Sequence, residues 1–277
     1  MSIKVIIISA NELRHKFFRK KVSSFEKVNV ELCLAEKNQS RHYFKVIKSP
    51  NYSAAEKKHF KDRQKSEKIY FGKFLKNNSD LKNLLVIKRG EFNYNTKIIN
   101  KIINIKPDII ISYGCSLIKN PILKKFKNKF INIHLGLSPY YKGSATNFWP
   151  FVYNEPQFAG VSFLKIDKGI DAAPIIHQIR PCFKEKDNIH DIGNKLIIKM
   201  INPLEIIIKN FKLLKSKKQK KSKIEKIFKK KDFDFASLKS LKRNFNSGMI
   251  RKYLKNKKKI DNKYPIVEQK YVRNSLS

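Results

Sequence analysis

Short apolar runs alternate with amphipathic stretches along this chain. The runs that predict β-strands lie at residues 3–10, 28–34, 84–87, 108–114 and 130–135. The stretches that predict helices lie at residues 11–21, around 53–75 and at 96–105, the first with Ser9 or Asn11 as its cap. Residues 108–114 are almost wholly apolar, as in a central parallel strand covered on both faces. Alternating strands and helices predict an α/β fold with a doubly wound, Rossmann-like, mostly parallel sheet.

The pattern changes towards the C-terminal end. Residues from Asp191 to about Leu213 are helical in pattern, with an interruption at Pro203. Residues 214–231 are dense in Lys and predict a solvated linker, and residues 232–254 predict another helix with an ambiguous break at Ser247-Gly248. We therefore expect a main domain over residues 1–213 and a Lys-rich linker with a short helical extension over residues 214–277.

The formal net charge of +40 invites a nucleic-acid interpretation, because 62 Lys and Arg stand against 22 Asp and Glu. However, only nine of these cations are Arg, the residue that suits bidentate contacts to phosphates and bases. Lys, Ile and Asn share A/T-rich codons, so a biased genome is an alternative cause of the excess. In either case the positive field attracts anionic ligands.

The sequence lacks the motifs of several protein classes, namely membrane proteins, secreted proteins, zinc proteins and nucleotide-cofactor enzymes. No apolar run approaches the ~18 residues that span a bilayer, and residues 5–10 predict a buried strand rather than a signal peptide. The three cysteines are far apart, which predicts reduced, mostly buried thiols in a cytoplasmic protein. No Cys or His pair has zinc spacing, and no G-x-G or P-loop motif is present, so we expect neither a metal nor a nucleotide cofactor of the usual kinds.

One stretch carries candidate chemistry. Asn132-Ile-His134 ends an apolar run, and the period of two along a strand places both side chains on one face. A turn, Ser138-Pro-Tyr-Tyr-Lys-Gly143, follows, and a second apolar run later ends in Asp167-Lys-Gly-Ile-Asp171. In a doubly wound sheet, ligands lie beyond the carboxyl ends of the strands. Residues 9–14, 114–118 and 132–134 should therefore meet in one cleft.

These motifs, in this order, resemble the folate-dependent formyltransferase family. That family includes the methionyl-tRNA, glycinamide ribonucleotide and sugar N-formyltransferases, and the resemblance covers about residues 80–200. It implies an enzyme, a formyltransferase, with its catalytic domain over residues 1–213 and N10-formyltetrahydrofolate as formyl donor. It assigns catalytic roles to Asn132, His134 and Asp171.

The residues suit that reaction. When an amine attacks the formyl carbon, the Asn132 amide and a His134 imidazolium can stabilise the oxyanion. Asp171 can orient the imidazole and accept the amine's proton through a water. A serine nucleophile is disfavoured, because no G-x-S-x-G elbow is present.

The resemblance also implies where the two substrates bind. The pterin of the donor would lie between the backbone after the central strand and a second loop, an expectation that falls on Ser116, Leu117, Ile118, Ile166, Asp167, Gly169 and Ile170. The acceptor is expected at the first loop and the turn, on Asn11, Arg14, His15, Tyr140 and Gly143. A helix N-terminus attracts anions, so Arg14 or His15 could hold a phosphate, although a surface Arg on an ordinary helix is an equal alternative.

The acceptor is not named by the sequence, and neither is the oligomeric state. We expect an amino sugar carried by a nucleotide, because the tail matches neither the β-barrel of the methionyl-tRNA enzyme nor the short glycinamide ribonucleotide enzyme. Formylation of methionyl-tRNA is the first alternative and would use the Lys-rich tail to bind RNA. A non-enzymatic basic protein on the same scaffold is the second alternative.

Overall fold

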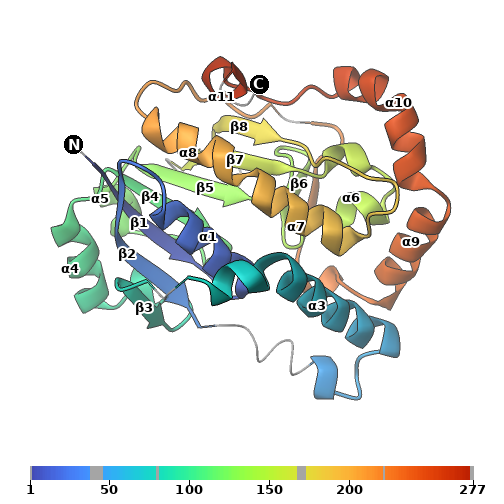
Figure 1. Cartoon of the computed structure of the whole chain (residues 1–277), viewed down its shortest axis with the longest axis horizontal. Helices are drawn as coiled ribbons and strands as arrows, with labels where there is room; N and C mark the ends of the chain where they lie inside the picture. Colours follow the sequence, from blue (N-terminus) through green and yellow to red (C-terminus); the bar gives the residue numbers. More distant parts are fainter. Residues whose placement is uncertain (1, 38–45, 79–80, 167–172, 221, 275–277) are drawn as a thin grey trace.

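Seven strands form one twisted sheet in the order β3-β2-β1-β4-β5-β7-β8 (Figure 1). The computed structural model describes residues 2–37, 46–78, 81–166, 173–220 and 222–274. The strands are β1 (Ile3–Ser9), β2 (Val28–Glu36), β3 (Leu84–Ile87), β4 (Ile109–Tyr113), β5 (Phe130–His134), β7 (Val161–Ile166) and β8 (Ile175–Ile179). The pairs from β3 to β5 are parallel, whereas β7 is antiparallel to both β5 and β8. The predicted α/β fold with a mostly parallel sheet is confirmed.

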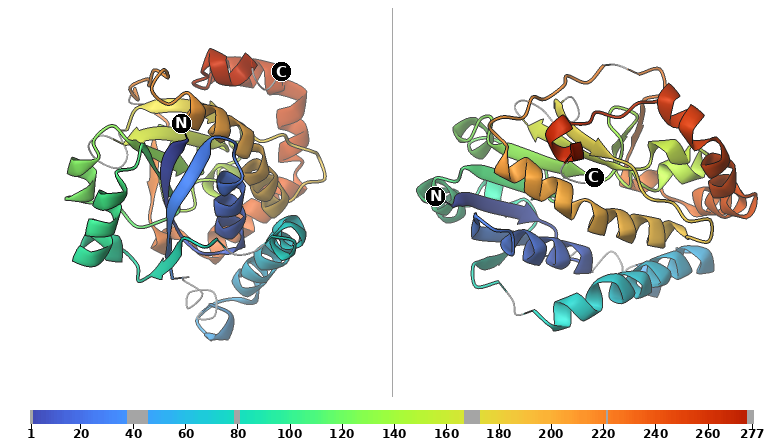
Figure 2. Two further views of the ribbon diagram at one scale, coloured as in Figure 1. Left: turned by 60° about the vertical axis from the view of Figure 1, so that its left-hand side comes forward. Right: turned by 45° about the horizontal axis from the view of Figure 1, so that its top comes forward.

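Helices cover both faces of the sheet (Figure 2). One face packs against α1 (Leu13–Ser23), α7 (Ile189–Lys199) and α8 (Ile201–Lys209), and the other against α4 (Thr96–Ile105) and α5 (Ile122–Lys125). Helix α3 (Ala54–Lys76) packs against α1 and α7. The isoleucines of β1 explain why both faces are covered. Ile7 packs in the core on the α1 side of the sheet, while Ile6 and Ile8 pack in the core on the α4 side. A strand with apolar side chains on both faces must be buried on both.

The starts of α3 and α4 follow local capping rules, but the start of α1 does not. Ser53 and Glu56 form a capping box at α3, and the Asn95 side chain caps α4. At α1 the predicted cap is wrong, because Glu12 is the N-cap residue and makes no side-chain cap hydrogen bond. Ser9 and Asn11 are engaged elsewhere: the Arg19 guanidinium donates to Ser9 Oγ at 2.8 Å and to Asn11 Oδ1 at 2.6 Å.

The segment after residue 209 returns to the sheet twice. The backbones of Lys217 and Ile175 exchange two hydrogen bonds of 2.8 Å, and the Gln178 N–H donates to the Val267 carbonyl at 2.7 Å. A short strand, β9 (Lys226–Phe228), pairs in parallel with β6 (Tyr141–Gly143). The residues predicted as a solvated linker therefore make backbone contacts with the main domain, while the division at residue 213 stays a prediction.

An aromatic cluster lies at one end of the molecule, between α6 (Trp149–Val152), α9 (Phe235–Asn246), α10 (Met249–Lys263) and the 3₁₀ turn η2 (Pro156–Phe158). Helix α11 (Lys270–Asn274) packs on α8, and the 3₁₀ turns η1 (Glu91–Asn93) and η3 (Lys230–Asp232) are short connections. The cluster joins Phe148, Trp149 and Phe151 to residues of α9 and α10, so these three aromatic side chains pack in the core. The break between α9 and α10 falls at Ser247 and Gly248, where Gly248 has φ of 74°.

The three thiols are unpaired: Cys33 is buried, Cys115 is half-buried and Cys182 is exposed. The expectation of mostly buried thiols thus holds fully only for Cys33. Among the described residues, no helix is long and apolar enough to cross a bilayer.

Candidate active site

Strand β5 carries the two side chains that the sequence singled out. Asn132 and His134 are half-buried and alternate with the buried Ile131 and Ile133, so they share one face at the carboxyl end of the strand. Ser112 lies opposite Asn132 on the neighbouring strand β4, and its hydroxyl donates to Asn132 Oδ1 at 2.9 Å. This bond holds the amide by its oxygen, which makes Nδ2 the donor end for a ligand.

The His134 imidazole is held by the backbone of the turn that follows it. Its Nε2 lies 3.0 Å from the carbonyl oxygen of Tyr141. Because a carbonyl oxygen only accepts, this contact places a hydrogen on Nε2. Gly136 leaves room for the ring, since a Cβ at that position would lie 3.0 Å from His134 Nε2 and 2.8 Å from Thr146 Cβ.

Two buried polar side chains, Ser162 of β7 and Gln178 of β8, bind the backbone of the turn that follows His134. Ser162 Oγ accepts from the Ser138 N–H at 3.0 Å and donates to the Gly136 carbonyl at 2.7 Å. Gln178 Nε2 donates to the Ser138 carbonyl at 2.7 Å and to Ser162 Oγ at 2.9 Å. The sequence analysis missed Ser112, Ser162 and Gln178, because their importance appears only once the register of the strands is known.

The residues expected along the pterin slot are brought together in part. Ile118 is 5% exposed and packs in the same cluster as Phe130 and Ile166, whereas Leu117 is 43% exposed. The Ser116 N–H donates to Glu36 Oε2 at 2.9 Å, and Arg89 Nε donates to Ser116 Oγ at 3.1 Å. The Leu117 carbonyl accepts from the Asn93 side chain at 2.8 Å.

The other half of that slot and the third catalytic candidate fall between residues 166 and 173. Asp167, Gly169, Ile170 and Asp171 lie outside the described residues. Their roles stay predictions.

The loop between β1 and α1 is the expected acceptor site. The N-terminus of α1 there is occupied by a network of charged side chains. Arg14 forms an ion pair with Glu67 of α3, and Arg63 Nε lies 3.2 Å from the same carboxylate. His15 Nδ1 lies 2.6 Å from Glu12 Oε2, and Arg14 lies 3.8 Å from Glu12. Two carboxylates therefore stand beside the two guanidinium groups, and the charge that could attract a phosphate is largely balanced.

Burial controls the protonation of this network. Burial first, and then the charge of Arg14, lowers the pKa of His15 to about 4, so the ring is neutral at pH 7. Burial alone would raise the pKa of Glu12, but the contact with His15 and the charges of Arg14 and Arg63 outweigh it and hold that pKa well below its usual range. The expected phosphate contact of Arg14 or His15 stays a prediction that the neighbouring carboxylates oppose.

The two acceptor candidates of the turn have intramolecular contacts. The Tyr140 ring packs 4.3 Å from the Phe158 ring, measured between centroids, and burial raises the Tyr140 pKa. Gly143 has φ of 85° and faces the Phe228 carbonyl of β9.

The remaining described histidines have structural surroundings. His59 and His190 face each other with ring centroids 4.7 Å apart, next to Phe148 and Phe233. His177 Nδ1 accepts from the Gln269 N–H at 3.1 Å. Within the described parts of the chain, no group of three or more His, Cys, Asp or Glu could hold a metal ion.

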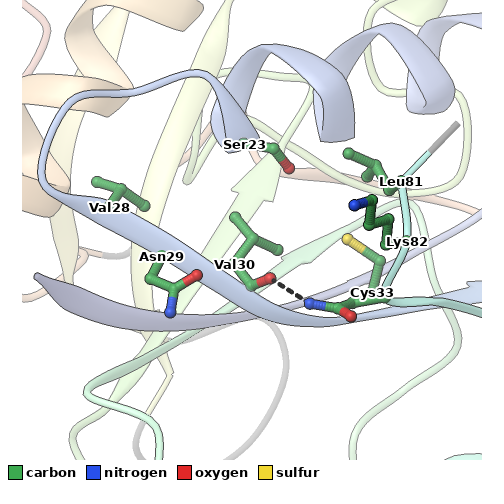
Figure 3. A pocket seen from close by; sticks show the side chains of 8 residues that line it. Ser23, Val28, Asn29, Val30, Cys33, Leu81 and Lys82 are labelled. Atoms are coloured by element: carbon green, nitrogen blue, oxygen red, sulfur yellow. Dashed lines mark hydrogen bonds between the residues drawn. The ribbon is translucent and has the colours of Figure 1, made fainter. Parts of the chain in front are cut away.

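A separate small pocket lies beside the first half of β2 and contains none of the candidate site residues (Figure 3). Its volume is about 130 Å³, and it is lined by Ser23, Val28, Asn29, Val30, Cys33, Leu81, Lys82 and Asn83. Sites for drug-sized ligands measure about 300–1,000 Å³, so this pocket is too small for a folate.

Comparisons with known proteins agree with the motifs. The family model described as "Formyl transferase" matches residues 22–200, which is more than half of the chain. The chain belongs to the formyl transferase family. A methionyl-tRNA formyltransferase from Thermodesulfovibrio yellowstonii is 31% identical over 102 residues, which cover 36% of this chain and 32% of that protein. The match thus spans about a third of that relative's length.

Solved structures with the same fold include enzymes that act on sugars. A sugar N-formyltransferase from Shewanella sp. has a TM-score of 0.56 at 15% identity and covers 87% of each chain. WlaRD, a sugar 3N-formyl transferase solved in the presence of dTDP and 5-N-formyl-THF, has a TM-score of 0.52 at 19% identity and covers 88% of this chain and 80% of that one. At these identities the likeness concerns the fold alone.

Proposed function

We propose that this chain transfers a formyl group from N10-formyltetrahydrofolate to a primary amine, and that the amine belongs to a nucleotide-linked amino sugar. The observation that carries the proposal is the pairing of Asn132 and His134 on one face of β5, in a member of the formyl transferase family. An amide donor and an imidazole at the carboxyl end of a parallel strand suit a reaction in which an oxyanion develops.

The chemistry follows from the donors in place. The acceptor amine forms a C–N bond to the formyl carbon, and the formyl oxygen becomes an oxyanion. Asn132 Nδ2, oriented through the Ser112 hydroxyl, donates to that oxyanion together with the protonated imidazole of His134. The bond from the formyl carbon to N10 then breaks, and the proton lost by the amine ends on N10. Asp171 is proposed to relay that proton.

The formyl donor is consumed as a substrate, and it needs an apolar slot with polar backbone edges. Ile118 and Ile166 provide the apolar wall. The flat pterin would lie against this wall, with the backbone of residues 116–118 at its edge.

An amino sugar is favoured as acceptor by the solved structures with this fold, because sugar N-formyltransferases share it over most of both chains.

Methionyl-tRNA is the competing acceptor, because the matched relative is a methionyl-tRNA formyltransferase. Helix α10 also presents a shallow groove lined by Lys255, Asn256, Lys258, Lys259 and Asn262. Lysines that hold RNA phosphates bind with an affinity that falls steeply with salt.

A formylation assay separates the two acceptors. The enzyme is given N10-formyltetrahydrofolate with either a panel of nucleotide amino sugars or charged initiator tRNA, at about 0.2 M salt, where the Debye length is below ~10 Å. We expect transfer to at least one sugar. Salt-resistant formylation of methionyl-tRNA with no activity on any sugar would select the competing acceptor, and no transfer to either would contradict the enzyme assignment.

A further inference from the structure

Strand β9 lies next to the segment that holds the His134 imidazole. Its partner β6 begins at Tyr141, whose carbonyl oxygen is the contact of His134 Nε2 at 3.0 Å. Two backbone bonds flank the pairing: the Lys226 N–H donates to the Tyr140 carbonyl at 2.8 Å, and the Ser144 N–H donates to the Phe228 carbonyl at 2.8 Å. The C-terminal segment thus fixes the backbone on both sides of Tyr141.

Gly143 makes this close approach possible. A Cβ at that position would lie 2.1 Å from the Phe228 carbonyl oxygen, and its φ of 85° is one that other residues rarely adopt. Any larger side chain must therefore displace β9 or β6.

Side chains reinforce the pairing. The Phe228 ring stacks on Trp149 with centroids 4.2 Å apart and lies nearly parallel to the buried Tyr141 ring at 6.0 Å. Lys226 Nζ lies 2.7 Å from Glu155 Oε2, and the Tyr141 hydroxyl donates to the same carboxylate. Strand, aromatic stack and ion pair all act on the segment that carries the Tyr141 carbonyl.

We propose that the C-terminal extension is a working part of the active site, in which β9 holds β6 so that the Tyr141 carbonyl fixes the tautomer and orientation of His134. With hydrogen on Nε2, Nδ1 is the nitrogen that gains and loses a proton during transfer. Tyr141, Gly143 and Lys226 are then positioning residues. The inference rests on the proposed function to the extent that His134 serves formyl transfer.

The main test is Gly143→Ala, read by kinetics and by ¹⁵N NMR of the six histidine rings, with His134→Gln used for assignment. In the unaltered protein, the ¹⁵N shifts of neutral His134 should report the Nε2–H tautomer. In Gly143→Ala the shifts should move towards a mixture of tautomers. Turnover should fall at least about 10-fold with KM for the formyl donor within about threefold, because general acid–base help is worth about 10²–10⁴ in rate.

A second pair of variants tests the inference independently, in case Gly143→Ala does not fold. Lys226→Pro removes the N–H that binds the Tyr140 carbonyl, whereas Lys226→Ala keeps that N–H and loses the side-chain contacts, which are the ion pair with Glu155 and the ammonium contacts with Tyr141 and Tyr153. We expect a larger loss of turnover and a larger tautomer shift in Lys226→Pro. Ile227→Ala is the matched control on the same strand, since Ile227 is 62% exposed, and it should behave as the unaltered protein.

The experiments distinguish failure of this inference from failure of the proposed function. Folded Gly143→Ala and Lys226→Pro variants with an unchanged His134 tautomer would overturn the inference, and so would a shifted tautomer with unchanged turnover. If the unaltered protein formylates no acceptor, the proposed function fails, but the tautomer measurement needs no substrate and still decides whether β9 controls His134.

Discussion

At the scale of single residues, Asn132 depends on a neighbour for its orientation. The Ser112 hydroxyl fixes its amide oxygen, so the donor Nδ2 needs no further ordering when the oxyanion forms. We expect Asn132→Ala to lower kcat by about 10²–10³-fold, the usual effect of removing one oxyanion donor. Ser112→Ala should cost less, about 10-fold, because the donor remains but loses its orientation.

Steady-state kinetics with circular dichroism check this order of effects. Ser24→Ala, which alters an exposed hydroxyl that donates to the Lys21 carbonyl, is the control. A folded Asn132→Ala variant with nearly normal kcat would exclude the amide from the mechanism.

Gly114 illustrates a close approach that demands glycine. Its φ is 65°, and an added Cβ would lie 2.6 Å from His15 Nε2. We expect Gly114→Ala to lower the free energy of unfolding by about 2–4 kcal/mol, from backbone strain together with overpacking. Urea unfolding of Gly114→Ala, His15→Ala and the double variant measures the coupling. If Gly114→Ala costs the same with and without the His15 ring, the contact is not what excludes a larger residue.

The sequence was sufficient to find Asn132 and His134, because a period of two at the end of an apolar run needs no tertiary information. Ser162 and Gln178 could not be found in this way. Their hydrogen bonds join residues 16 to 40 positions apart, so their role depends on strand register.

At the scale of elements, local pattern predicted strands and helices with strong signals. The bounds of β3 and α4 agree with the prediction, since a short apolar run and a helix ending before Pro107 are local features. Strands β6, β8 and β9 were not predicted. β8 contains His177 and Gln178, polar residues satisfied by the remote Gln269 and Val267, and the other two strands have only three residues each.

The contact between α1 and α3 depends on buried charges. Glu67 lies between Arg14 and Arg63, with its side chain 7% exposed. We expect Glu67→Gln to destabilise the protein by about 3 kcal/mol, because it leaves buried guanidinium charge uncompensated. Asp62→Asn on the same helix breaks an exposed pair with Lys58 and should cost less than about 0.5 kcal/mol. Chemical denaturation of both variants tests this, and equal effects would refute the role of burial.

At the scale of the whole molecule, stability should depend on pH through buried histidines. Burial is the largest cause that lowers the pKa of His59 to about 3 and those of His15, His177 and His190 to about 4. Below the ordinary value of about 6.5, the unfolded chain binds protons that the folded chain does not, so stability falls as pH decreases. Each group contributes on the order of 1–2 kcal/mol between pH 6.5 and pH 5.

Calorimetry across this range gives the measurement. We expect Tm to be nearly constant from pH 8 to pH 7 and to fall progressively from about pH 6.5 to pH 4. His59→Phe should flatten part of this slope, since the ring already packs among aromatic side chains. A Tm that stays constant down to pH 5 would mean that these rings are accessible to protons in the folded state.

The C-terminal segment that pairs with β8 through Lys217 and Val267 should keep the protein from self-associating. β8 is the last strand of the sheet, and one side of it would present unpaired N–H and C=O groups to other molecules. Backbone bonds from Lys217 and Val267 occupy part of that side. A chain cut after Leu213 would expose this edge together with its neighbouring isoleucines. Light scattering should therefore detect self-association of the shortened protein, because the C-terminal segment shields the sheet from edge-to-edge pairing.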